Sequence, residues 1–227
     1  MFNELIDNQL QDYCDKHTSI DNGVLYQLHR ETHLKTAYPR MMCTPAQGVF
    51  LQFISSMLKP QRILEIGTYT GYATICLSTG LAQNGELITI EKDVEKEDII
   101  RKYLHLAGIE QKVQLIFGDA MDIIPTLSGQ WDLIFMDADK TNYIHYYNML
   151  KNQLSENSIM LIDNVLWSGK VFDDTLKCDK ETNIISQFND MIQSDLEVDN
   201  IILPIRDGVM MVRKKNVREY ENFTNLQ

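Results

Sequence analysis

Between residues 62 and 213 the chain alternates short apolar runs with longer segments of helical periodicity, and this alternation limits the possible fold more than any other feature. Runs of about five apolar residues bounded by polar ones predict buried parallel strands. Alternating strands and helices predict a doubly wound parallel sheet. Only the turn residues 204–208 separate the last two runs, which predicts an antiparallel hairpin at the end of the sheet.

We therefore expect an α/β fold with a Rossmann-like sheet of seven strands, mostly parallel. The predicted strands cover residues 62–66, 86–90, 113–117, 131–136, 158–162, 198–203 and 209–213. The predicted helices between them cover residues 71–81, 94–107, 121–127, 142–154 and 181–194.

The part of the chain before residue 60 indicates helices. Apolar residues spaced along 5–13 and along 24–29 predict two amphipathic helices. Thr44 followed by Pro45 predicts the start of a third, with the threonine as N-cap. We expect this third helix to pack on a sheet through one apolar face, made of Val49, Phe50, Phe53, Ile54 and Met57. The prediction is one domain over 1–227, with a helical cap or dimerisation region at 1–59 and the core at 60–215.

The composition disfavours two broad classes of function. The net charge of −11 argues against a broad nucleic-acid-binding surface, although a local basic patch is compatible with it. The N-terminus lacks the pattern of a signal peptide, and no apolar stretch approaches the roughly 20 residues that span a bilayer. Cys14, Cys43, Cys76 and Cys178 form no CxxC pair and predict reduced thiols in a cytoplasmic protein without a membrane partner.

Oxygen-bearing side chains follow two of the predicted strands. Asp137 follows strand 131–136, and Asp163 and Asn164 follow strand 158–162. Neighbouring strands lie about 4.8 Å apart, and open α/β sheets bind ligands at the carboxyl ends of their strands. Two carboxylates and an amide suit a hard cation such as Mg²⁺ and not Zn²⁺. For each residue alone a role in turning the chain is the favoured interpretation, so the metal interpretation depends on all three together with the nucleoside site.

The turn between the first strand and its helix predicts a nucleoside site. It has the spacing G-x-x-x-G from Gly67 to Gly71, without the middle glycine of a dinucleotide motif, which favours a ligand that lacks a diphosphate. Glu91 lies about 20 residues further on, where a carboxylate accepts ribose hydroxyls. Asp119 and Ala120 follow the third strand, where Asp119 could accept the amine of adenine. Glu91 could instead be a solvated residue of a charged stretch, and Asp119 a helix cap.

Three blocks of sequence resemble the class I S-adenosylmethionine-dependent methyltransferases. More narrowly, they resemble the cation-dependent O-methyltransferases, which include catechol and caffeoyl-CoA O-methyltransferases and bacterial relatives. The blocks are LEIGTYTGY at 64–72, MDADKTNY at 136–143 and LIDNV at 161–165. The resemblance extends from Met41 to about Lys214.

The resemblance implies a binding site for S-adenosylmethionine. The residues that it assigns to this site are Glu65, Gly67, Thr68, Ala73, Glu91, Ala120 and Asp137, with a contribution near Met41. Ala73 stands where the family often has serine, so one hydroxyl contact to the methionine carboxylate is missing here.

The resemblance also gives the metal trio a chemical role. A divalent cation, Mg²⁺ or otherwise Ca²⁺ or Mn²⁺, could chelate two adjacent hydroxyls of an aromatic acceptor and acidify one of them. Lys140 resembles the family's lysine near that hydroxyl and is the candidate general base. A lysine of ordinary pKa is protonated at pH 7, so Lys140 could instead stabilise the phenolate. Candidate acceptor-pocket residues are Asp139, Asn142, Tyr143 and Trp167, although Tyr143 and Trp167 could equally be core aromatics.

We expect a cation-dependent O-methyltransferase for a small catechol-like or phenylpropanoid acceptor of the caffeoyl type. One alternative keeps the chemistry but methylates hydroxylated uridine in transfer RNA, which the acidic charge disfavours. A second is an NAD-dependent oxidoreductase, which the missing glycine and the metal trio disfavour. A third is a non-catalytic nucleoside-binding module, which Lys140 beside the trio disfavours. The family resemblance also implies a homodimer.

Overall fold

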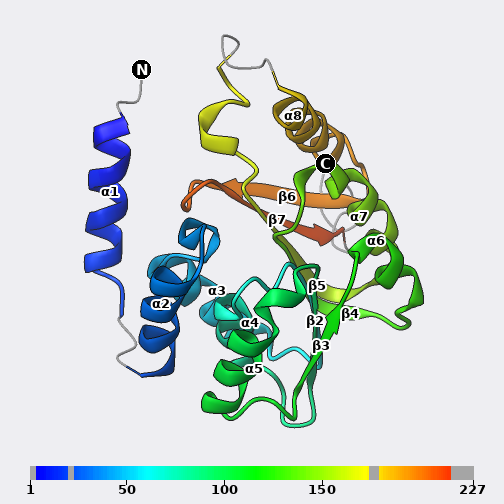
Figure 1. The fold of residues 1–227 in the computed structure, drawn as a ribbon. Helices are drawn as coiled ribbons and strands as arrows, with labels where there is room; N and C mark the ends of the chain where they lie inside the picture. Colours follow the sequence, from blue (N-terminus) through cyan, green and yellow to red (C-terminus); the bar gives the residue numbers. More distant parts are fainter. Residues whose placement is uncertain (1–3, 20–22, 174–178, 216–227) are drawn as a thin grey trace. The chain divides into compact units, whose positions relative to one another are not determined.

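The computed structural model describes residues 4–19, 23–173 and 179–215. The strands are β1 (Arg62–Ile66), β2 (Glu86–Glu91), β3 (Val113–Phe117), β4 (Trp131–Met136), β5 (Leu154–Asp163), β6 (Val198–Leu203) and β7 (Val209–Lys214). They form a seven-stranded sheet in the order β3-β2-β1-β4-β5-β7-β6 (Figure 1). The fold class is confirmed, including the antiparallel pairing of the C-terminal hairpin.

The helices follow the predicted alternation. The α-helices are α1 (Glu4–Lys16), α2 (Val24–Lys35), α3 (Pro45–Leu58), α4 (Tyr72–Ser78), α5 (Glu97–Leu106), α6 (Ala120–Ile123), α7 (Tyr143–Leu150) and α8 (Lys180–Gln193). Short 3-10 turns are η1 (Pro39–Met41), η2 (Val94–Lys96), η3 (Ile124–Thr126), η4 (Lys140–Asn142), η5 (Lys151–Gln153) and η6 (Trp167–Gly169). Three of the predicted helices, those over 94–107, 121–127 and 142–154, each combine an α-helix with one of these turns.

The chain divides into two compact units, Met1–Ile123 and Ile124–Gln227, and each is described by itself. In the first unit β1 pairs in parallel with β2, and β2 with β3. In the second unit β4 pairs in parallel with β5, while β7 is antiparallel to both β5 and β6. The predicted division into a cap over 1–59 and a core over 60–215 stays a prediction.

Strand β5 begins four residues earlier than predicted. Trp131 pairs with Leu154 and Leu133 with Ile159, so the register shifts between these two pairs. The extra residues include Asn157, whose φ is +62°. A β-bulge accommodates such extra residues in one strand. The apolar-run criterion missed this part of the strand because the bulge is polar.

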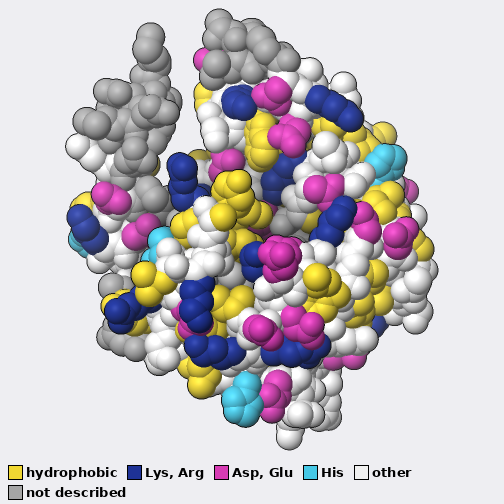
Figure 2. Space-filling view, viewed as in Figure 1, with side chains coloured by type: hydrophobic (Ala, Val, Ile, Leu, Met, Phe, Trp, Pro, Cys, Tyr) yellow, Lys and Arg dark blue, Asp and Glu magenta, His cyan; other side chains and the backbone are white. Residues whose placement is uncertain are grey.

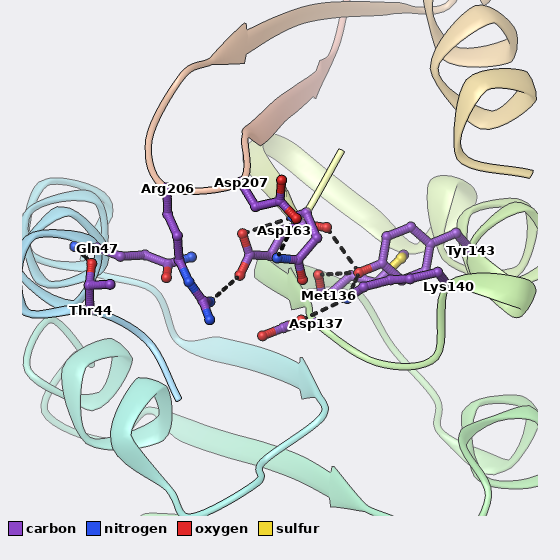
Figure 3. Close-up of polar contacts among 10 residues, drawn as sticks. Thr44, Gln47, Met136, Asp137, Lys140, Tyr143, Asp163, Arg206 and Asp207 are labelled. Atoms are coloured by element: carbon purple, nitrogen blue, oxygen red, sulfur yellow. Dashed lines mark hydrogen bonds and ion pairs between the residues drawn. The ribbon is translucent and has the colours of Figure 1, made fainter. Parts of the chain in front are cut away.

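The N-terminus of α3 forms as predicted, but its buried face is different. Thr44 is the N-cap and accepts a hydrogen bond from the backbone N–H of Gln47 at 3.3 Å (Figure 3). Phe53 and Met57, which were expected to pack on a sheet, are 64% and 71% exposed. Ile54 is buried, as expected.

Small residues explain the buried face of α3. A Cβ atom on Gly48 would lie 2.7 Å from the ring of Tyr72 in α4. A Cβ atom on Gly80 would lie 2.0 Å from the backbone carbon of Ser55 in α3. The Ser55 hydroxyl also donates to the carbonyl of Leu77 at 2.5 Å. Because α3 meets α4 through close backbone contact, its small residues point inward and some of its large apolar ones point to solvent.

A carboxylate joins helices α2 and α5 in the first unit. Glu31 accepts hydrogen bonds from Lys102 at 2.5 Å, from the Tyr103 hydroxyl at 2.7 Å and from Lys35 at 2.8 Å. These bonds lower the pKa of Glu31 to about 2, and the bond from Lys102 has the largest effect, followed by the bond from Lys35. Folding is therefore linked to the ionised form of Glu31.

We expect Glu31→Gln to lower the free energy of unfolding at pH 7 by about 1–2 kcal/mol. This value lies between the stability contribution of an exposed ion pair and that of a hydrogen bond to a charged group. A lowered pKa in the folded state means that the contribution is present above about pH 4.5 and is lost as pH falls towards 2. Urea unfolding of the parent and the variant at pH 7, 5, 4 and 3 measures this.

The matched control is Glu97→Gln, which removes an exposed pair with Arg101 in α5. It should change the free energy of unfolding by less than about 0.5 kcal/mol at every pH. A Glu31→Gln variant as stable as the parent at pH 7 would contradict the role of this carboxylate.

In the second unit, aromatic side chains fix α7 against α8. The rings of Tyr143 and Tyr147 meet the ring of Phe188 edge-on, with centroids 5.5 Å and 6.2 Å apart. All three rings are buried. Edge-to-face contacts of this kind add about 0.5–1.5 kcal/mol beyond area burial. They hold the start of α7, and therefore the preceding turn η4, in a fixed position.

Three described cysteines form no disulfide with one another, Cys14 exposed and Cys43 and Cys76 buried. Cys178 lies outside the described residues. Across residues 4–19, 23–173 and 179–215, no helix is both long enough and apolar enough to cross a membrane.

Candidate active site

The glycine turn of the first unit has the backbone conformation that its sequence predicts. Gly67 and Gly71 have φ values of +97° and +89°, in the region that favours glycine. The Gly67 N–H donates to the carbonyl of Ile90 at 3.0 Å, which joins the turn to the end of β2. Gly71 is also the N-cap of α4. The turn therefore lies directly before a helix start, and its two glycines adopt the positive φ values that a sharp turn requires.

Glu91 is held by backbone N–H groups at the end of β2. Its Oε2 accepts from the N–H of Tyr69 at 2.6 Å, and its Oε1 accepts from the N–H of Asp93 at 2.8 Å. The side chain is buried, and burial raises its pKa against the opposing effect of these N–H groups. Glu91 is not the solvated surface residue of the alternative interpretation. Its carboxylate is fixed beside the glycine turn.

Three threonines surround the fully buried Glu65 of β1. The Glu65 Oε2 accepts from the Thr74 hydroxyl at 2.5 Å and from the Thr89 hydroxyl at 2.6 Å. The Thr89 and Thr68 hydroxyls lie 2.5 Å apart. This network connects Glu65 to the glycine turn and to α4, so that two of the predicted cofactor residues, Glu65 and Thr68, share one hydrogen-bonded cluster.

The other predicted cofactor residues of the first unit have different surroundings. Ala73 in α4 and Ala120 in α6 are buried, whereas Met41 in η1 is exposed. The hydroxyl of Tyr69, in the glycine turn, lies within hydrogen-bond distance of the Thr36 hydroxyl at 2.8 Å and of the Tyr38 carbonyl at 2.9 Å. These bonds connect the segment just before Met41 to the glycine turn.

Asp119 shows the contacts of a helix cap. Its Oδ1 accepts from the N–H of Met121 at 2.9 Å, and its Oδ2 pairs with Lys92 at 2.7 Å. The bond from Lys92, and then that from Met121, lower the pKa of Asp119. A contact to adenine stays a prediction, since both carboxylate oxygens already have partners in this structure.

The predicted metal ligands lie at adjacent strand ends of the second unit. Met136 of β4 pairs with Ile162 of β5 in parallel register. Asp137, which follows β4, therefore lies level with Asp163, the last residue of β5. Asn164 comes next, with a φ of +61°. Figure 3 shows Asp137 and Asp163 in this region. The register places Asp137 and Asp163 at neighbouring strand ends, and their joint binding of a cation with Asn164 stays a prediction.

Each predicted metal ligand has polar partners in the structure. Asp163 is 0% exposed, its Oδ1 accepts from the N–H of Asn164 at 2.8 Å and its Oδ2 lies 3.3 Å from Arg206 Nη1. The Asn164 Nδ2 donates to Asp207 at 3.4 Å. Asp137 Oδ1 accepts from Lys140 at 2.8 Å. Both carboxylates therefore stand beside a cationic side chain.

The chemistry of this donor set fits a hard divalent cation. Fully buried carboxylates need a cationic partner, and two carboxylates with an amide oxygen are ligands that Mg²⁺, Ca²⁺ and Mn²⁺ accept. No group of three or more His, Cys, Asp or Glu side chains in the described part of the chain is arranged to hold a metal ion. The candidate trio falls outside that definition because its third member, Asn164, has an amide side chain.

Lys140 lies in η4, directly after β4 and its Asp137. Its buried amine donates to Asp137 Oδ1 at 2.8 Å and to the Tyr143 hydroxyl at 2.7 Å. The Tyr143 hydroxyl donates in turn to the carbonyl of Asp163 at 3.0 Å. Tyr143 is fully buried, and burial raises its pKa well above the ordinary value. In this structure Tyr143 holds Lys140 beside the carboxylate trio.

The remaining candidate acceptor residues form two groups. Asp139 accepts from the Tyr146 hydroxyl and the Asn142 amide, both at 2.6 Å, and these contacts shape η4. Trp167 lies in η6 with a φ of +49°. Its indole N–H is buried and has no hydrogen-bond partner among the described residues. Trp167 therefore has a donor group that a ligand could use, while Asp139 and Asn142 bond to each other.

The sequence analysis did not select Arg206 and Asp207. Both lie in the turn between β6 and β7, and the turn reaches the trio because β7 pairs with β5, with Asp163 opposite Val209. Asp207 Oδ1 accepts from the N–H of Ser168 at 2.5 Å, and burial raises the pKa of its carboxyl. A strand-order prediction that placed β7 beside β5 could have found them.

Comparison with known proteins identifies the family. The chain matches the O-methyltransferase family over residues 15–215. It belongs to this family and is an O-methyltransferase.

Individual relatives agree with this assignment. A catechol O-methyltransferase of Niastella koreensis is 35% identical over 73% of this chain and 76% of its own length. A caffeoyl-CoA O-methyltransferase of Stellaria longipes is 29% identical over 77% of this chain and 76% of its own. Among solved structures, an SAH-bound methyltransferase of Podospora anserina has a TM-score of 0.86 and 30% identity, covering 95% of this chain and 98% of that one.

Proposed function

We propose that this chain is a divalent-cation-dependent O-methyltransferase. In this proposal S-adenosylmethionine donates the methyl group, and the acceptor is one hydroxyl of a small aromatic diol of the catechol or caffeoyl type. The observation that carries the proposal is the fully buried Asp163 at the strand position next to Asp137, with the Lys140 amine hydrogen-bonded to Asp137. A lysine and a set of hard oxygen ligands at one strand edge suit the ionisation of an acceptor hydroxyl.

The first unit supports the assignment of the methyl donor. Glu91 is fixed by two backbone N–H groups at the end of β2, where it can accept the ribose hydroxyls. The glycine turn leaves backbone available to the amino-acid part of the donor. The relative from Podospora anserina was solved in its SAH-bound form. The proposed donor residues of this chain are Met41, Glu65, Gly67, Thr68, Ala73, Glu91, Asp119 and Ala120, with Asp137 from the second unit.

The second unit supports the assignment of the cation and the catalytic lysine. Asp137, Asp163 and Asn164 would hold a divalent cation, which supplies Lewis acidity and binds two adjacent hydroxyls. Lys140 Nζ would take the proton of the reacting hydroxyl or stabilise the oxygen as its charge develops. To act as a general base the amine must be in its neutral form, because an ammonium group has no lone pair to accept the proton. A neutral amine can still donate to Asp137 and to the Tyr143 hydroxyl, as in this structure. Tyr143 positions the amine.

The names of the relatives support an acceptor with neighbouring hydroxyls. One relative is a catechol O-methyltransferase and another is a caffeoyl-CoA O-methyltransferase. The buried indole N–H of Trp167 is a donor that such an acceptor could use. We place Trp167 in the acceptor site, with Asp139 and Asn142 shaping its edge. We also expect a homodimer, which sedimentation of the purified protein would measure.

The surface gives little support to transfer RNA as the acceptor. On the face drawn in Figure 2, Lys and Arg side chains are interspersed with Asp and Glu. The net charge of −11 would repel a polyanion over most of the protein.

The direct test of this function is methyl transfer to a panel of acceptors. Purified protein, labelled S-adenosylmethionine and Mg²⁺ are incubated with catechol, caffeate, caffeoyl-CoA, the monohydroxylated analogue of each and bulk transfer RNA. We expect label in the diols, at least about tenfold less in their single-hydroxyl analogues, and none above background in transfer RNA. Labelling of transfer RNA alone would contradict the proposed acceptor class.

A further inference from the structure

The turn between β6 and β7 places two charged side chains beside the proposed cation ligands. Arg206 Nη1 lies 3.3 Å from Asp163 Oδ2, and Asp207 Oδ2 accepts a hydrogen bond from Asn164 Nδ2 at 3.4 Å. All four residues lie in the second unit, and Figure 3 shows Arg206 extending from the turn to the Asp163 carboxylate. One turn thus contacts two of the three proposed ligands.

The guanidinium occupies the carboxylate oxygen that a metal ion would need. Asp163 Oδ1 accepts the backbone N–H of Asn164 at 2.8 Å, and Oδ2, the oxygen that Arg206 contacts, is the atom where we expect a cation to bind. Asp163 is 0% exposed, and the Arg206 side chain is 19% exposed. A buried carboxylate without a cationic partner is strongly unfavourable. Arg206 supplies positive charge to Asp163 from a position that retains access to solvent.

The backbone of the turn holds Arg206 in an unusual conformation. Its φ is +53°, in the left-handed region that residues with a Cβ atom rarely adopt. The turn is closed by the Gly208 N–H, which donates to the carbonyl of Ile205 at 2.9 Å. The chain therefore carries a long cationic side chain at a position where glycine would fit with less strain.

A guanidinium and a divalent cation would repel each other at this carboxylate. Mg²⁺ binds oxygen at about 2.0–2.1 Å, and an ion on Oδ2 would share that atom with the Arg206 nitrogen. Like charges a few ångströms apart in a buried site repel strongly, because little solvent screens them. Both cations cannot keep their best geometry on the same oxygen.

We propose that Arg206 is the built-in counter-cation of Asp163 and competes with the divalent cation for this carboxylate. The proposal rests on the cation-dependent function proposed above. Binding of a divalent cation displaces the Arg206 guanidinium from Oδ2, and Arg206 thereby weakens the affinity of the site for metal. Asp207 has the opposite effect: by accepting from Asn164 Nδ2, it leaves the amide oxygen of Asn164 as the atom for the cation.

The test measures metal binding without any reaction. Chelator-treated parent, Arg206→Gly and Arg206→Gln are titrated with Mn²⁺, and free Mn²⁺ is followed by electron paramagnetic resonance. Arg206→Gly also relieves the positive φ, and Arg206→Gln keeps a long polar side chain without charge. We expect both variants to bind Mn²⁺ at least tenfold more tightly than the parent. The control Arg213→Gln, which removes an exposed pair with Asp199 on the same hairpin, should stay within twofold.

Thermal unfolding gives a second and independent result. In EDTA Arg206→Gln should unfold at a lower temperature than the parent, because Asp163 loses its counter-cation while the positive φ remains. Saturating Mn²⁺ should then raise the unfolding temperature more in the variants than in the parent. Should Arg206→Gly fail to fold, Arg206→Gln supplies the same comparison.

The outcomes separate this inference from the proposed function. Mn²⁺ binding by the parent with equal or weaker binding by the Arg206 variants overturns the competition and leaves cation dependence standing. An absence of Mn²⁺ binding in the parent and in both variants overturns the competition and the proposed cation site together.

Discussion

Asp163→Ala is expected to lower the turnover number of methyl transfer to a diol by about 10³-fold or more. A bound cation contributes several kcal/mol to a reaction of this kind, and each 1.36 kcal/mol corresponds to a factor of ten. Asp163 is the fully buried member of the trio and stands next to Asn164, so the substitution removes a principal ligand. Steady-state rates with labelled donor measure the loss, and Mn²⁺ titration should show that metal binding is lost in parallel.

The Asp163 result needs two controls. Asp199→Ala removes another aspartate of the second unit, one that pairs with Arg213 on the hairpin and should retain the parent rate within about twofold. Calorimetric binding of S-adenosylhomocysteine should be preserved in Asp163→Ala, because the proposed ribose ligand Glu91 is untouched. Turnover by Asp163→Ala at the parent rate in the presence of EDTA would refute the role of the trio.

Lys140→Ala is expected to lower the turnover number by 10²- to 10⁴-fold, roughly the contribution of a general base. The Lys140 amine is buried and donates to Asp137 and to the Tyr143 hydroxyl, so truncation to alanine removes the positioned amine. The Michaelis constant for the donor should change much less than the turnover number, although Lys140 hydrogen-bonds Asp137, one of the proposed donor residues. Single-turnover rates under saturating donor measure the chemical step.

The matched control for this lysine is Lys151→Ala. Lys151 is similarly buried and pairs with Asp195 at 2.6 Å, but it lies in η5, beyond the other end of α7. Its removal should lower stability and leave the turnover number within about twofold. A Lys140→Ala enzyme with the parent single-turnover rate would remove Lys140 from the reaction.

The strands were predictable because their apolar runs are short and sharply bounded. Strands β1, β3, β4 and β6 have the predicted limits. The same criterion missed the start of β5, where a polar bulge continues the pairing. It also gave α3 the wrong buried face, because close backbone contact at Gly48 and Gly80 outweighs the burial of Phe53. Apolar patterning locates a strand, but it does not detect contacts made by glycine and serine.

The trio Asp137, Asp163 and Asn164 could be proposed from sequence because parallel strands end at a common edge. Parallel register between Met136 and Ile162 then brings the first two together. The contacts of Arg206 depend on β7 pairing antiparallel with β5, which local sequence does not specify. From sequence Tyr143 could be assigned only to an acceptor site or to the core. Its hydrogen bond to Lys140 depends on the three-dimensional arrangement of η4 and α7, which the sequence pattern does not specify.

The most direct measurement is the initial rate of methyl transfer from labelled S-adenosylmethionine to catechol by metal-stripped protein, with Mg²⁺ or with EDTA. The proposed chemistry predicts rapid transfer with Mg²⁺, a rate at least about 10²-fold lower in EDTA, and full recovery when Mg²⁺ is restored in excess. Equal rates in Mg²⁺ and in EDTA would contradict it.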